Sequence, residues 1–383
     1  MSRKRVEALV TRELLSWART TAGLSVEEIA AKLNTKVERV QEWEAGVRRP
    51  TIGQARKWAD ATRRPLVVLY LTEVPTDFTP IRDFRRFTVG EDLARSPGLL
   101  FQIREAQERR EVFIGLLEEA GEDAEPFALA ASTDDEPEVL GGRVRQFLGV
   151  SLDQQQKWKH KYEPLNGWKR AIERRGVLVF QSTRVDLDEM RGFSIAAQTL
   201  PVIVLNPGDS PRARAFTLMH ELAHVAIRQA GVCDLEGDQS VEVFCNAVAA
   251  AALVPRTSFL DQTIGMDRDE HWTDDRIKWL ADFFSVSNTV VLRRLVTVRK
   301  ATWQFYRRKT ALYAKAAREA AGKRAKKETP ILPDRLAISQ LGGPFLSLAI
   351  RSYWENRISI NELATMAGVG VKYIPRIQTD VMR

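Results

Sequence analysis

Two histidines four positions apart carry the most informative chemistry in this sequence. His220 and His224 lie in the run from Phe216 to Ile227, which has no proline or glycine and is apolar on more than one face. This pattern predicts a buried helix. Residues four apart project from one side of a helix, so both imidazoles can bind a single ion. Glu221 lies about 100 degrees round the helix from His220, within reach of a water molecule on that ion.

A zinc ion needs a third protein ligand, and the next predicted helix supplies a candidate. Glu242 lies in an alanine-rich segment, residues 240–255, which a proline ends. Asn246 follows one turn later, where its amide would orient a histidine or the glutamate. Two antiparallel helices connected through Gly231 and Gly237 would bring the three ligands together and leave the fourth position to water.

These residues and their spacing closely resemble those of the ImmA/IrrE family of bacterial zinc metallopeptidases. The resemblance rests on three segments, Phe216-Thr217-Leu218-x-His220-Glu221-Leu222-Ala223-His224, Glu242-x-x-Cys245-Asn246 and Arg191-Gly192-Phe193-Ser194. It implies that His220, His224 and Glu242 bind Zn²⁺ and that Glu221 is the general base of peptide hydrolysis. Family members cut helix-turn-helix repressors and so relieve repression after stress, which implies a protein substrate of that kind.

Composition describes an ordinary globular protein with an uneven charge. The chain has 383 residues, 44% hydrophobic and 28% charged, which predicts two or three domains. No apolar run reaches about 18 residues and no signal peptide is present, so we expect a cytoplasmic protein with no membrane contact. Two cysteines are too few for a disulfide framework, and Cys245 is expected in the core.

The charge is concentrated in two stretches. Residues 118–138 hold nine acidic side chains and no basic one, whereas residues 293–327 hold thirteen Lys or Arg against one Glu. The basic stretch is typical either of a surface that binds nucleic acid or an acidic partner, or of a solvated helix face.

Residues 8–71 are predicted to form five short helices, the second of which begins with the capping box Ser25-x-x-Glu28. The pattern Leu24-Ser25-x-Glu27-Glu28-Ile29-Ala30-x-x-Leu33, followed by Val40-x-x-Trp43-Glu44-x-Gly46, resembles the phage-repressor-like (XRE) helix-turn-helix family. By that resemblance the side chains that face a DNA major groove are Lys36, Val37, Glu38, Gln41 and Glu42, with Arg39 near the DNA backbone.

Two of these side chains work against DNA binding. Glu38 and Glu42 would face a polyanion and weaken the electrostatic attraction, although an acidic residue can accept a hydrogen bond from cytosine. Residues 1–75 are still positive, with fourteen Lys or Arg and nine Asp or Glu. We therefore expect double-stranded DNA as a partner, with a docking module as the alternative. A homodimer is a further expectation, since such repressors usually read two half-sites.

The predicted fold is mainly α with a small β-sheet (α+β). Residues 1–75 form the helix-turn-helix domain, 76–140 a linker and helical segment, 141–310 the zincin-like metallopeptidase domain, and 311–383 a basic helix with a small C-terminal helical module around Ile360–Ala364 and Gly368. Strands are expected at Val177–Phe180 and Leu200–Leu205. Val202–Leu205 is either a peptide-binding edge beside the metal or an interior strand.

A helix pair around Leu280 and Leu295 also has a helix-turn-helix pattern and is predicted to be structural, packed on the peptidase core. The first functional hypothesis is a DNA-associated zinc endopeptidase that regulates transcription by cleaving a specific protein. The alternative is a DNA-binding repressor or antitoxin-like regulator that uses the zinc fold for binding or sensing without proteolysis.

Overall fold

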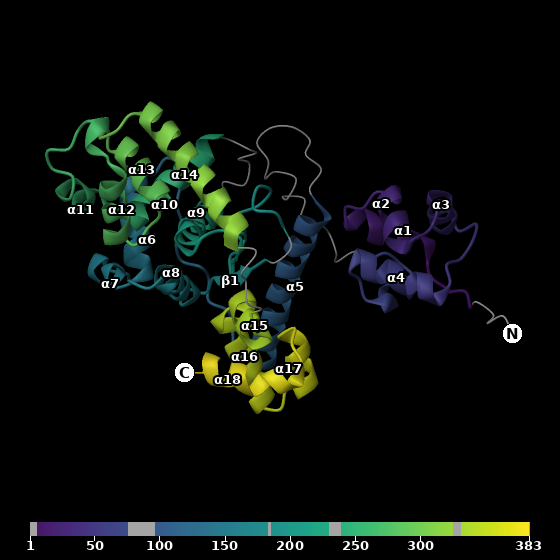
Figure 1. Ribbon diagram of the computed structural model, residues 1–383. Helices are drawn as coiled ribbons and strands as arrows, with labels where there is room; N and C mark the ends of the chain where they lie inside the picture. The colour runs from purple at the N-terminus through teal and green to yellow at the C-terminus, as the bar shows by residue number, and fades with distance from the viewer. Residues whose placement is uncertain (1–5, 76–95, 183–184, 230–238, 325–330, 383) are drawn as a thin grey trace. The chain divides into compact units, whose positions relative to one another are not determined.

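The computed structural model describes residues 6–75, 96–182, 185–229, 239–324 and 331–382. The chain divides into two units, Met1–Gln107 and Glu108–Arg383, and each is described by itself. Residues 76–95, the first part of the predicted linker and helical segment, lie outside the described residues, as does the connection through Gly231 and Gly237. The chain is mainly helical with one three-stranded sheet, so the predicted fold class is confirmed (Figure 1).

The first unit contains the five predicted helices, and the fifth is a 3₁₀ helix. They are α1 (Arg12–Thr21), α2 (Val26–Leu33), α3 (Val37–Glu44), α4 (Ile52–Thr62) and η1 (Leu66–Tyr70). Their apolar faces enclose one core that includes Leu15, Ile29, Trp43 and Trp58. The long helix α5 (Pro97–Glu119) follows and runs into the second unit.

The turn between α2 and α3 has a defined geometry at both ends. Ser25 and Glu28 form the predicted capping box, in which each side chain bonds the backbone N–H of the other residue. Helix α2 ends at Asn34, whose left-handed backbone (φ 51°) is a conformation that asparagine tolerates better than most residues. The chain therefore reverses within a few residues, and α3 begins directly after Lys36.

The sheet of the second unit is built from β1 (Leu178–Gln181), β2 (Gly192–Ile195) and β3 (Val202–Leu205) in the order β1-β3-β2. Strand β3 pairs parallel with β1 and antiparallel with β2. The prediction that Val202–Leu205 is a peptide-binding edge is therefore wrong, and the alternative of an interior strand is confirmed. All four residues of β3 are buried, as expected for a strand with a neighbour on either side.

The rest of the second unit up to Arg324 is helical. Its helices are α6 (Pro137–Leu148), α7 (Leu152–Gln156), α8 (Glu163–Glu173), α9 (Pro211–Gln229), α10 (Gln239–Leu253), α11 (Arg256–Asp261), η3 (Asp269–His271), α12 (Asp274–Phe283), α13 (Asn288–Thr297) and α14 (Trp303–Arg324). Helix α9 packs on β2 and β3, and α10 packs between α9 and α6. No helix of the described residues is long and apolar enough to span a membrane.

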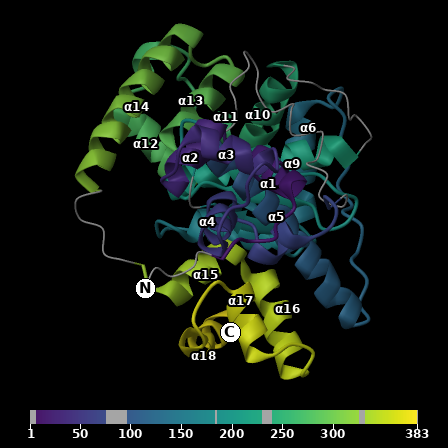
Figure 2. The same ribbon diagram turned by 90° about the vertical axis from the view of Figure 1, so that its right-hand side faces the viewer.

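The chain finishes with a C-terminal helical module of α15 (Pro333–Leu341), α16 (Gly343–Trp354), α17 (Ile360–Met366), η4 (Val371–Tyr373) and α18 (Ile374–Val381). Figures 1 and 2 show these yellow helices at one end of the second unit and α11 to α14 at the other. The module joins the sheet through α15, where the Ser339 hydroxyl donates to Gln181 of β1.

Helices α6 and α10 approach each other very closely because both carry small residues at their contact. A Cβ atom added at Gly141 of α6 would lie 2.6 Å from the Ala251 Cβ and 2.8 Å from the Ala252 backbone nitrogen of α10. A buried ion pair lies nearby, since Arg294 of α13 donates to both carboxylate oxygens of Glu138 at 2.5 and 2.6 Å. Helix α10 is thus held along its C-terminal half by backbone contact with α6.

We predict opposite effects for two neighbouring glycines of α6. Gly141→Ala is expected to lower the free energy of unfolding by about 1–3 kcal/mol, because the new methyl group overlaps the α10 backbone. Gly142 has no atom within 4 Å of its Cβ position, so Gly142→Ala is expected to raise it by about 0.5–1 kcal/mol. Urea unfolding of the two variants checks this, and equal effects would show that α6 and α10 do not make this contact.

Candidate metal centre and nucleic-acid interface

Helix α9 places the two histidines and the glutamate between them at the centre of the second unit. Its apolar residues, including Leu218, Leu222 and Val225, are fully buried in the main core. The prediction of a buried helix at this position is therefore confirmed. His220, His224 and Glu221 are also largely buried, and Glu221 has an exposed fraction of only 7%.

The structure brings His220, His224 and Glu242 together. The two Nε2 atoms are 3.1 Å apart. One carboxylate oxygen of Glu242 lies 3.3 Å from Nε2 of His220 and the other 3.2 Å from Nε2 of His224. Ligands bound at 2.0–2.1 Å to a tetrahedral zinc ion are roughly 3.3 Å from one another. The donor atoms thus have the spacing that one metal ion would require, and the residues fit a divalent cation.

The electrostatics of the three side chains are coupled. Burial opposes protonation of His220, but the hydrogen bond to Glu242 and the charges of Glu221 and Glu242 outweigh it, so the pKa of His220 is raised. The hydrogen bonds from His220 and His224 hold the pKa of Glu242 far below its ordinary value. The cluster therefore attracts positive charge, and a metal ion would displace the protons that otherwise supply it.

Strand β2 lies directly against the part of α9 that holds Thr217 and Glu221. A Cβ atom at Gly192 would be 2.6 Å from the Cγ2 of Thr217 and 3.5 Å from the Cγ of Glu221. Only a glycine lets the strand approach α9 this closely. The edge of the sheet beside Glu221 is consequently β2. The resemblance included Gly192, but a strand of four residues without apolar alternation was too short to predict from the sequence.

Asn246 lies one turn after Glu242 on α10, as expected, and is partly buried. Among the described residues, its amide makes no hydrogen bond to any of the three candidate ligands, and the buried Nδ1 atom of His220 has no hydrogen-bond partner. The orienting role of Asn246 therefore stays a prediction.

Arg293 is a residue near the cluster that the sequence did not suggest. It lies on α13, which packs against α10, and its charge lowers the pKa of His220. It is partly buried and forms no ion pair within the described part of the chain. No local motif marks it, because only the packing of α13 brings its positive charge near the histidines.

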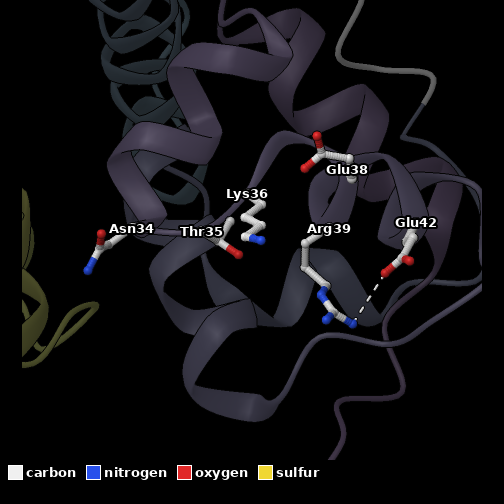
Figure 3. Close-up of a pocket in the computed structure, with 6 residues that line it drawn as sticks. All are labelled: Asn34, Thr35, Lys36, Glu38, Arg39 and Glu42. Carbon is white, nitrogen blue, oxygen red and sulfur yellow. Dashed lines mark ion pairs between the residues drawn. The ribbon is translucent and has the colours of Figure 1, made fainter.

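The predicted DNA-facing residues lie together on the first unit. Lys36, Glu38 and Gln41 are exposed, and Val37, Arg39 and Glu42 are partly buried. An open cavity of about 520 Å³ is lined by Asn34, Thr35, Lys36, Glu38, Arg39 and Glu42, and Figure 3 shows these side chains. The start of α3 is therefore accessible, which a helix that enters a major groove requires.

The negative charge of Glu42 is offset by its neighbours. The Nη1 atom of Arg39 lies 3.2 Å and the Nε atom of Arg48 3.5 Å from one Glu42 carboxylate oxygen, and the first pair is the dashed line in Figure 3. Glu38 forms no ion pair with a described residue. The negative charge that was expected to weaken DNA binding is thus partly neutralised at Glu42 and remains at Glu38.

Comparison with known families agrees with this geometry. Residues 172–296 match the IrrE N-terminal-like domain of the peptidase M78 family, and this range contains all four candidate metal and catalytic residues. Residues 15–69 match a helix-turn-helix family and include α2 and α3. The predicted fusion of these two domains is confirmed. The chain matches no curated protein.

We predict that His224→Ala and Glu242→Gln each weaken the binding of a divalent ion by at least about 100-fold. Loss of a residue that merely supports a ligand costs 10- to 100-fold, and loss of a ligand should cost no less. Calorimetric titration of the chelator-treated protein with Zn²⁺ and Co²⁺ measures the affinity.

Glu221→Gln is the matched control, because this carboxylate lies beside the ligand face and its variant should bind the ion as the wild type does. Wild-type affinity in Glu242→Gln would remove Glu242 from the ligand set.

Proposed function

We propose that this protein is a DNA-associated, zinc-dependent endopeptidase that regulates transcription by cleaving a specific protein. The observation that carries the proposal is the convergence of His220, His224 and Glu242 with the buried Glu221 beside them. The match to a peptidase family over residues 172–296 and to a helix-turn-helix family over residues 15–69 supports both halves of the proposal.

Zinc is the ion that the donor set favours. Two imidazole nitrogens and one carboxylate with an open fourth position are typical of catalytic zinc sites, whereas magnesium and calcium prefer sites made of oxygen ligands alone. When bound, zinc lowers the pKa of a water molecule and polarises a peptide carbonyl group.

Glu221 is proposed as the general base and acid. Its carboxylate accepts a proton from the attacking water and later donates that proton to the amine that leaves. Burial of Glu221 keeps this carboxylate away from bulk solvent. A site that only held an ion would have no need of a buried carboxylate between its two histidines.

The outer edge of β2 is proposed to hold the substrate as an added strand. The backbone N–H of Asn206 donates to the carbonyl of Arg191, so Arg191 faces β3. Backbone groups alternate along an antiparallel strand. Those of Gly192 and Ser194 therefore point away from β3. Ser194 is fully buried and Gly192 is partly exposed, so Gly192 is the position of β2 that is open to a peptide beside Glu221. A peptide paired with Gly192 would lie next to the candidate metal ligands in an extended conformation.

The fused helix-turn-helix supports a proposal about where the enzyme works and what it cleaves. We propose that α3 binds double-stranded DNA and that the substrate is a repressor of the helix-turn-helix type, which the DNA-bound enzyme would meet at a promoter. A homodimer would place two copies of α3 on two half-sites.

We predict that Glu221→Gln abolishes peptide cleavage and leaves promoter repression intact. The amide cannot accept the proton from water, and removal of a general base typically costs 10²–10⁴-fold in rate. Cleavage is measured by mass spectrometry on a peptide library prepared from a bacterial proteome, with the zinc-loaded full-length protein.

The zinc content of the variant must equal that of the wild type. If the loaded wild type cleaves neither the library nor intact helix-turn-helix repressors, the alternative applies, a regulator in which the metal fold binds or senses without proteolysis.

A further inference from the structure

The C-terminal helical module contains a second helix-turn-helix, residues 343–381, which neither family match covers. Helices α16, α17 and η4 with α18 follow one another as α1, α2 and α3 do. Each residue lies 334 positions after its counterpart, as Ser359 does after Ser25. From Arg12 to Trp43 the two segments correspond position by position without a gap.

The backbone hydrogen bonds of the two turns coincide. Ser359 and Glu362 form a capping box, as Ser25 and Glu28 do. The turn then closes with a bond from the Val369 N–H to the Ala364 carbonyl, 3.0 Å, where the first unit has Thr35 to Ala30 at 2.9 Å. Gly368 (φ 65°) takes the left-handed position of Asn34 (φ 51°).

The buried residues coincide as well. The equivalent core pairs are Leu14 and Leu348, Leu15 and Ala349, Ala18 and Ser352, Leu24 and Ile358, Ile29 and Leu363, Ala30 and Ala364, Leu33 and Ala367, Val40 and Ile374, and Trp43 and Ile377. Equivalent residues of 25–43 and 359–377 are alike in being buried, partly buried or exposed, except at the pairs 32/366, 37/371 and 42/376. The same pattern of burial leaves the same helix face outside.

A third turn in the chain shows that the same turn geometry can precede a helix in which equivalent positions are buried. Helices α12 and α13 are joined by the same bond, from the Val286 N–H to the Ala281 carbonyl, with Ser285 left-handed (φ 54°). There the positions of Arg39 and Gln41 are taken by Val290 and Leu292, which are buried. These two side chains pack in the main core of the second unit, which agrees with the structural role predicted from the sequence, although Thr289 at the position of Glu38 is exposed.

The exposed face of the C-terminal helix-turn-helix carries positive charge. Lys372 and Arg376 occupy the positions of Glu38 and Glu42, so the two acidic side chains of α3 are replaced by two basic ones. Both are exposed, and neither forms an ion pair with a described residue. Gly370, Val371 and Pro375 complete the face and are exposed too. Uncompensated cations on such a face are suited to phosphate oxygens.

We propose that residues 343–381 are a second DNA-binding unit, in which Lys372 and Arg376 contact the phosphate backbone at a major groove. Pro375 replaces the base-reading Gln41, so this unit supplies affinity and position more than sequence selection. One chain would then contact DNA at two places, independently of whether its metal centre is a peptidase.

The test uses the full-length protein and a labelled duplex of about 40 base pairs and mixed sequence, roughly four helical turns. Anisotropy titrations over a range of salt concentrations give the affinity and its salt dependence. Arg376→Glu is expected to lower the affinity about tenfold and to reduce the slope of log K against log salt by about 1, the loss of one phosphate contact. Arg335→Glu, an exposed arginine of α15 with the same change in charge, is expected to keep the wild-type slope.

Lys36→Glu, alone and combined with Arg376→Glu, separates the contribution of α3 to DNA binding from that of the C-terminal helix-turn-helix. If Lys36→Glu has no effect while Arg376→Glu does, α3 does not bind DNA and the present proposal stands. Circular dichroism and the milder variant Arg376→Gln, which should give a smaller loss in the same direction, control for folding.

The proposal is overturned if Arg376→Glu and Arg335→Glu give the same affinity and slope. It is also overturned if Arg376→Glu leaves DNA binding unchanged but reduces cleavage or capture of a protein partner, since the face would then be a protein-docking surface.

Discussion

The candidate metal centre depends on how closely α10 lies against α6 and α9. The two histidines come from successive turns of α9 and need no tertiary contact to face the same side, but Glu242 must be delivered to them by another helix. Small residues make this approach possible, because Gly141 of α6 meets the backbone of α10 at Ala251. With a larger side chain at that contact, α10 would move outward and carry the carboxylate away from the imidazoles.

Burial and charge are opposed at this site, and the opposition favours a cation. Glu221 and Glu242 bring negative charge to histidines that are mostly removed from water, and proximity to carboxylates raises the pKa of His220 although burial opposes it. Arg293 is the nearby positive charge that works in the other direction. The cluster is therefore incomplete without either protons or a metal ion, and its donor spacing of 3.1–3.3 Å suits the ion.

Local sequence patterns predicted most of the helices and strands, but not which of them pack against one another. The spacing of His220 and His224 and the capping box at Ser25 are periodic or local signals, and both appear in the structure as expected. The place of β3 inside the sheet was not predictable, because a run of four apolar residues fits an edge as well as an interior strand. Strand β2, the closeness of Gly192 to α9 and the position of Arg293 depend on contacts distant in sequence.

The three helix-turn-helix pairs show why a fold alone does not decide a function. Their turns share one backbone geometry, since each has a left-handed residue followed by the same closing hydrogen bond. What differs is the second helix of each pair. In α13 the positions of Arg39 and Gln41 are apolar and buried, and in α3 the groove-facing positions mix acidic and basic side chains. In η4 and α18, Lys372 and Arg376 are exposed and form no ion pair with a described residue. One motif can thus present faces of different burial and charge, because these properties are set independently of the turn.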